Sequence, residues 1–132
     1  MSSPATIPYP PVLVRAGEAE HLDSIGHVLL ADSSATGGAL SSHRVALGRG
    51  ADGAMPHRHG NSSELFYILD GAFDVLAGEE VLTAYAGDLL VVPPGVAHAF
   101  AAHRGSTAEA LIIAIPGIER FDYFRHVVRR RE

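Results

Sequence analysis

The sequence predicts an all-β domain that ends in a short helix. Three observations support this. Short apolar segments recur about every ten residues after residue 48, turn-forming residues separate them, and only the last segment repeats with a helical period. Short strands at this spacing indicate an antiparallel sandwich or barrel.

The N-terminal part has weaker signals. Residues 1–11 contain four prolines and predict an extended arm. Residues 12–14, 27–30 and 42–47 are short apolar segments and predict strands, and the small residues of segment 31–38 predict a loop between two of them.

The pattern sharpens from Gly48 onward. Asp70-Gly71 lies between two apolar runs and predicts a hairpin turn, because Asp-Gly favours the left-handed turn that joins adjacent strands. The predicted strands in this part are residues 64–69, 72–77, 81–84, 89–92, 97–101 and 108–115.

The C-terminal segment predicts a helix. Four apolar residues recur at helical spacing and would share one face, namely Ile118, Phe121, Phe124 and Val128. The predicted organisation is therefore an arm (1–11), a β-barrel domain (12–116) and a C-terminal helix (117–132).

Composition excludes several classes of protein. A net charge of -5 argues against a nucleic-acid binder, which is usually basic. No apolar run approaches the ~20 residues that span a bilayer, and the first residues lack the features of a secretory signal, so we expect a cytoplasmic protein. The chain has no cysteine and no lysine, which excludes disulfides, a cysteine nucleophile and a lysine Schiff base.

One predicted strand is apolar on both faces. Leu65, Tyr67 and Leu69 alternate with Phe66 and Ile68. An exposed face this apolar is usually covered. The arm, the helix or a second copy of the chain would each cover it, and we expect a homodimer.

Three histidines and one glutamate form the most informative pattern. His57, His59 and Glu64 lie in the segment H-R-H-G-N-S-S-E, and His98 ends the segment P-P-G-V-A-H. Three imidazoles and one carboxylate suit a divalent transition metal such as iron, manganese, nickel, zinc or cobalt. Four protein ligands leave positions open for substrate on an ion that takes six.

The local sequence explains how these ligands would converge. In a strand, His57 and His59 point to the same side, with Cα atoms ~7 Å apart. Residues 60–63 are turn formers, so the chain can restart with Glu64 facing inward beside Phe66. His98 follows a Pro-Pro-Gly turn and shares a strand face with Phe100.

These segments resemble the two motifs of the cupin family, G-x5-H-x-H-x4-E-x6-G and G-x5-P-x-G-x2-H-x3-N. The first spans residues 51–71 and the second spans residues 87–102, and eight of the ten motif positions agree at the correct spacing. The departures are Ala51, where the first motif has glycine, and Ala102, where the second has asparagine. Neither position is a metal ligand.

The resemblance covers residues 40–116 well. It implies a small jelly-roll barrel of antiparallel strands with the metal inside its mouth, and often a dimer. The segment P-G-I-E-R-F at residues 116–121 also looks like the end of many quercetin-dioxygenase-like cupins.

Other residues are candidates for contact with substrate. His43 alternates with Val45 and Leu47. It would either face the cavity, as a substrate contact or as support for the metal ligands, or be an exposed or structural histidine. Met55, Phe66 and Phe100 would form an apolar wall around the metal. The histidines expected in solvent are His21, His27, His103 and His126.

Three functions fit this pattern. The first is an oxygen-dependent dioxygenase of flavonol-like or catechol-like molecules, with Glu64 as a metal ligand and as the base that takes the substrate proton. The second is a metal-dependent cyclase or isomerase of polyketides or keto acids that uses no oxygen. The third is a small-molecule or metal-binding protein without catalysis.

Overall fold

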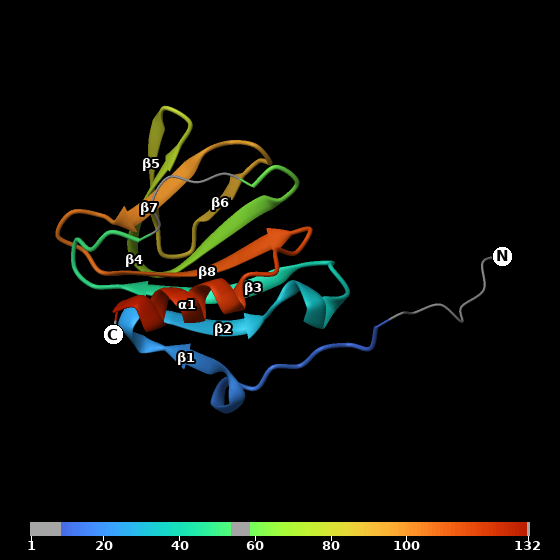
Figure 1. The fold of residues 1–132 in the computed structure, drawn as a ribbon. Helices are drawn as coiled ribbons and strands as arrows, with labels where there is room; N and C mark the ends of the chain where they lie inside the picture. Colours follow the sequence, from blue (N-terminus) through green and yellow to red (C-terminus); the bar gives the residue numbers. More distant parts are fainter. Residues whose placement is uncertain (1–8, 54–58, 132) are drawn as a thin grey trace.

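Two antiparallel sheets that share one bent strand make up the chain (Figure 1). The computed structural model describes residues 9–53 and 59–131. The strands are β1 (Glu20–Leu22), β2 (His27–Ala31), β3 (Ser41–Leu47), β4 (Ser63–Ala77), β5 (Glu80–Tyr85), β6 (Leu89–Val92), β7 (His98–Ala102) and β8 (Ala108–Ile115). The helices are the short 3-10 helices η1 (Ala16–Glu18), η2 (Asp23–Ile25) and η3 (Ser33–Thr36), and the α-helix α1 (Phe121–Arg131).

Strand β4 organises the fold. Its first half pairs with β8 and β6, and its second half pairs with β5 and β7. Strands β1, β2 and β3 extend the first sheet beyond β8. The predicted all-β jelly roll with a short C-terminal helix is therefore confirmed.

The predicted hairpin at Asp70-Gly71 is wrong, because β4 runs through it. The register against β8 shifts between Ile68 and Asp70, and Gly71 has a φ of 70°. A Cβ on Gly71 would lie 1.9 Å from the carbonyl oxygen of Thr107. Glycine therefore permits a bulge and a close backbone approach here, and the strand bends from one sheet into the other.

The core lies between the two sheets and is built on the alternation of β4. Fully burying one such apolar side chain stabilises the fold by roughly 1.5–3 kcal/mol. Glu64 lies on the same inward face of β4 as Phe66, as predicted, so the packing that holds the strand also fixes the carboxylate. The fully buried side chains are Phe66, Phe73, Ile68, Ile112, Val45, Val75, Val92 and Ser41.

The N-terminal strand lies later than predicted. Residues 12–14 have no regular structure, and β1 pairs instead with β2. Val12 and Leu13 are exposed, which shows that a short apolar run alone does not form a strand without a partner. Tyr9 lies against Gly37, close to the start of β3.

Helix α1 begins at Phe121, later than the predicted segment 117–132. The carboxylate of Asp32 accepts hydrogen bonds from the backbone N–H groups of Arg120 and Phe121, at 2.9 and 3.2 Å. A side chain distant in sequence thus sets where the helix starts. No helix in the described part of the chain has the length and apolar character to cross a membrane.

Candidate functional site

Three of the four predicted metal ligands come together in the structure. The candidate ligand atoms of His59, Glu64 and His98 all lie within 4.8 Å of one another. Nε2 of His98 is 2.7 Å from Oε1 of Glu64, and Nε2 of His59 is 3.5 Å from the same oxygen. The fourth, His57, and the predicted wall residue Met55 lie outside the described residues.

Backbone contacts orient His98. It begins β7, and its Nδ1 lies 3.0 Å from the carbonyl oxygen of Val96. A carbonyl can only accept, so Nδ1 donates to Val96, and Nε2 is the ring nitrogen that is directed at Glu64. A histidine that binds a metal is usually oriented in this way.

His59 lies before β4 begins and in no regular strand, and a contact between loops holds it in place. The expected alternation of a strand therefore does not position it. The backbone N–H of Gly95 donates to the carbonyl oxygen of His59 at 2.8 Å. This bond joins the segment of the first motif to the turn that precedes His98, and so brings the two motifs together.

The donor set fits a divalent transition metal. Bonds of ~2.1 Å to one ion place neighbouring ligand atoms roughly 3 to 3.4 Å apart. The separations of 2.7 and 3.5 Å at Glu64 bracket that range. Glu64 and His98 are only 3% and 2% exposed, so a cation would be held away from bulk water.

Arg120 is a site residue that the sequence did not predict. Its Nη2 donates to Oε2 of Glu64 at 2.7 Å, and its side chain is 11% exposed. Glu64 therefore presents Oε1 to the histidines and Oε2 to a guanidinium. Arg120 lies in the segment 116–121 that the sequence analysis noted, but it is 56 residues from Glu64 and nothing in that segment predicts the pair, so only the folded chain reveals it.

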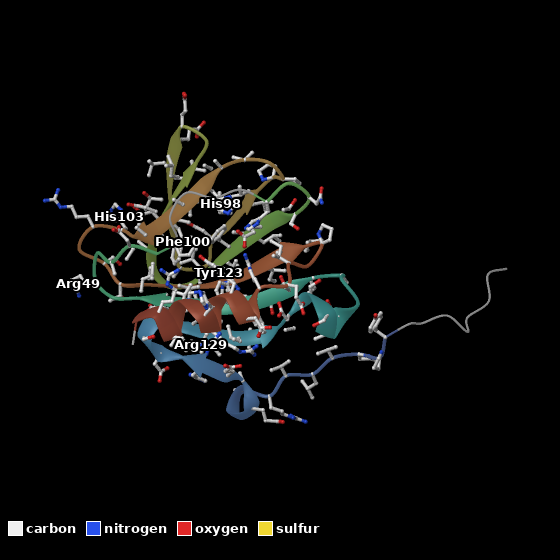
Figure 2. All side chains as sticks on the ribbon, in the orientation of Figure 1. Arg49, His98, Phe100, His103, Tyr123 and Arg129 are labelled. Atoms are coloured by element: carbon white, nitrogen blue, oxygen red, sulfur yellow. The ribbon has the colours of Figure 1, made fainter. Side chains whose placement is uncertain are left out.

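A cavity of about 820 Å³ opens beside these residues. His59, Glu64 and Arg120 line it together with the predicted residues His43 and Phe100. In Figure 2, His98 and Phe100 lie on the β7 side of the molecule and Tyr123 on the α1 side. The volume suits a small organic ligand.

Phe66 lies behind the cavity wall and not on it, in contrast to the prediction. It is fully buried and packs within the core cluster. Its ring meets His98 edge-on, with the centroids 6.2 Å apart. Side chains alternate along β4, so the next inward position after Glu64 lies in the core. Phe66 occupies this position and packs against His98.

A cluster of rings lines the cavity on the side of the helix. His27 stacks on His43 with ring centroids 5.1 Å apart, and Phe124 meets these rings at 4.6 and 4.9 Å. The expectation that His27 is solvated is wrong, since it is half-buried and contacts the cavity. His27 pairs with Val45 on the neighbouring strand, two residues from His43, and this register is not specified by the sequence.

The environment of His43 keeps its imidazole neutral. Burial is the main cause that lowers its pKa well below the usual value, and the charges of Arg120 and His27 act in the same direction. Glu64 opposes them. A neutral imidazole carries one hydrogen-bond donor and one acceptor at the cavity wall.

Comparison with known proteins agrees with this architecture. KdgF from Halomonas sp. has a TM-score of 0.66 and 22% identity, over 86% of this chain and 99% of that one. A predicted oxalate decarboxylase from Thermotoga maritima has a TM-score of 0.67 and 21% identity, over 80% and 99%. Streptomyces PAC13, in a structure with uridine, has a TM-score of 0.65 and 20% identity, over 86% and 88%.

These similarities are below 25% identity and show the fold alone. The search of curated proteins found no match. The family described as the Cupin domain, in contrast, matches residues 43–115, more than half of the sequence. That stretch includes His59, Glu64 and His98, so the family match and the site geometry fall on the same residues, and the chain belongs to the cupin family.

Proposed function

We propose that this protein is a metal-dependent enzyme that acts on a small organic molecule. One observation carries the proposal: two imidazoles and a carboxylate converge at a cavity large enough for such a molecule. We include His57 as the fourth ligand, on the sequence motif alone. When bound, the metal would supply a Lewis acid that acidifies a substrate oxygen, and a redox-active ion would also supply oxygen chemistry.

Residues of the chain would position the metal ligands, accept a proton and exclude water. Arg120 holds Oε2 of Glu64, which keeps Oε1 directed at the histidines. Glu64 would also accept the proton of a substrate hydroxyl, since a carboxylate can change its partners within the site. Phe100 and Ile112 line the cavity and exclude water from the substrate.

The reaction that we propose first is the dioxygenation of flavonol-like or catechol-like molecules. A cavity lined by aromatic and aliphatic side chains beside a nitrogen and oxygen ligand set supports this choice. The solved structures with this fold carry names of different activities, so the fold does not select the reaction.

The metal site is tested first. Protein purified without added metal is examined by elemental analysis, and we expect close to one divalent transition metal per chain. His98→Ala should lose about nine-tenths of that metal, because a buried carboxylate would face an incomplete ligand set. His103→Ala is the matched control, since His103 pairs with Asp74 at 2.9 Å and does not line the cavity. Full occupancy in His98→Ala would refute the ligand assignment.

Oxygen uptake then tests the reaction. Iron-loaded protein is supplied with a panel of flavonols and catechols in an oxygen electrode, with an anaerobic parallel. We expect uptake that depends on both substrate and iron. No uptake with any member of the panel would count against the dioxygenase.

A second candidate is cyclisation or isomerisation without oxygen. Glu64 favours it, because a carboxylate that lines the cavity beside the candidate metal ligands can accept and return a substrate proton without oxygen. Full turnover of a polyketide or keto acid by zinc-loaded protein under nitrogen would establish this reaction in place of the first.

A further inference from the structure

Arg120 has a hydrogen-bond donor that the fold leaves unused. A guanidinium carries five N–H groups. Nη2 is taken by Glu64 and the face of the group lies 5.6 Å from the ring of Phe124, but Nε is buried and has no partner among the described residues. An unsatisfied buried donor costs about 1–3 kcal/mol, which a ligand acceptor would recover.

His43 offers a second unused polar atom on the same cavity. Its side chain is 2% exposed, and its Nδ1 has no hydrogen-bond partner within the described ranges 9–53 and 59–131. His27 and Phe124 pack on the ring and fix its orientation. Buried polar groups are nearly always paired in native proteins, so an unpaired one at a cavity wall suggests a missing ligand.

The two groups belong to one subsite. Both contact the ring of Phe124, His43 with its ring centroid at 4.9 Å and Arg120 with its guanidinium carbon at 5.6 Å. Val45, Ile112 and Ile118 line the cavity with them and offer only apolar surface. A ligand here would place one polar end on His43 and Arg120 and an apolar body against the wall.

Charge determines the nature of that polar end. Glu64 is the carboxylate paired with Arg120, and it is also a proposed ligand of a divalent cation. With such a cation bound, one negative charge would not balance both partners, and the inner end of the cavity would carry excess positive charge. Guanidinium groups in such surroundings bind carboxylates through charge-assisted hydrogen bonds.

We propose that Arg120 and His43 form a binding site for the carboxylate of a small organic acid with an apolar body. This inference rests on the proposed metal-dependent function and narrows the substrate class of the same cavity to organic acids, such as the keto acids of the second candidate, rather than simple flavonols or catechols. Arg120 then has two roles: it positions Glu64 through Nη2 and recognises substrate through Nε.

Binding of matched acids and amides tests the proposal. Zinc-loaded protein is titrated in a calorimeter with benzoate, phenylacetate and cinnamate, and with the amide of each. We expect at least one acid to bind about tenfold more tightly than its amide, as a charged hydrogen-bond partner implies. If no acid in the series is preferred to its amide, the proposal is overturned.

Variants assign the preference to the two residues. Arg120→Gln at saturating zinc should bind acid and amide within about twofold of each other, because the charge that discriminates them is gone. Arg44→Gln is the control, since Arg44 pairs with Glu109 at 3.7 Å and lies outside the cavity lining. An acid preference that survives Arg120→Gln would refute the assignment.

His43→Leu separates a binding role from a structural one. We expect weaker binding of the preferred acid with unchanged zinc content and an unchanged or higher melting temperature, because the variant removes an unpaired buried nitrogen. Unchanged acid affinity in this variant would remove His43 from the site.

The same titrations distinguish failure of the inference from failure of the proposed function. Stoichiometric zinc binding without any acid preference would refute the acid site and leave the metal enzyme intact. An acid preference in protein that binds no zinc would support the acid site and refute the metal enzyme.

Discussion

Glu64 serves different partners with its two oxygens. Oε1 faces His98 and His59, and Oε2 accepts a hydrogen bond from Arg120. A carboxylate that is 3% exposed depends on such partners, because an unpaired buried charge is costly. The position of Arg120 therefore bears on how well Glu64 can bind a metal.

Removal of Arg120 should weaken metal binding without abolishing it. Partners that orient metal ligands typically contribute about 10–100-fold in affinity, and we expect Arg120→Gln to lose affinity for zinc within this range. Competition with a chelating dye measures the change, with Arg44→Gln as the reference. Wild-type affinity in Arg120→Gln would show that the ion pair does not orient Glu64.

His43 should make the stability of the fold depend on pH. Its pKa is lowered in the folded state, so below the unfolded value of about 6.5 the unfolded chain binds a proton that the folded chain resists. The free energy of unfolding therefore falls as pH decreases from 7.5 to 5.5, by at most about 1.4 kcal/mol per pH unit from this residue.

Urea denaturation at a series of pH values checks this expectation. His43→Leu should lose less stability than the wild type over the same range, because the other histidines are common to both proteins. Parallel pH profiles for the two proteins would show that His43 does not contribute.

At the scale of elements, the bend in β4 allows one strand to serve both sheets. It depends on Gly71, which combines a φ of 70° with a close approach to the backbone of Thr107. Because of the bend, Glu64 on the first half of β4 and Ala77, the register partner of His98, on the second half lie in different sheets.

Gly71→Ala should therefore destabilise the protein by about 2 kcal/mol or more, the sum of backbone strain and a steric clash. Gly78→Ala is the matched control. Gly78 has a φ of 62°, but no atom lies within 4 Å of the position that its methyl group would take, so it should lose only the ~1 kcal/mol of the backbone term. Equal losses in urea denaturation would show that the approach to Thr107 is not limiting.

At the scale of the whole molecule, the outer face of the first sheet is an exposed apolar surface. Neighbouring strands β4, β6 and β8 contribute it. Helix α1 lines the cavity instead, and Tyr9 of the arm lies against Gly37. The exposed side chains of this outer face are Tyr67, Leu69, Leu89, Val91 and Ile115.

We propose that a second copy of the chain covers this face, because neither the N-terminal arm nor helix α1 does so within the described residues. Light scattering should give twice the chain mass of 13.9 kDa. Leu89→Glu should give monomers, since it places a charge in the contact. Val81→Glu, at a 64% exposed residue of β5, should remain a dimer. A wild-type monomer, or a dimer that tolerates Leu89→Glu, would contradict the proposal.

The sequence by itself determined the fold class and the three candidate metal ligands that the structure brings together. Alternation and turn residues are local properties, and they predicted most strands and the inward face of Glu64. The spacing of His59, Glu64 and His98 was sufficient because the turns beside them are encoded within a few residues.

Only the tertiary structure decided the features that depend on contacts between distant segments. Asp70-Gly71 has the composition of a hairpin, but pairing with β8 makes it a bulge. Arg120 reaches Glu64, and Asp32 sets the start of α1, across long sequence separations. Such pairs leave no periodic signal, because one long-range contact constrains only two positions, whereas a strand constrains every second residue along its length.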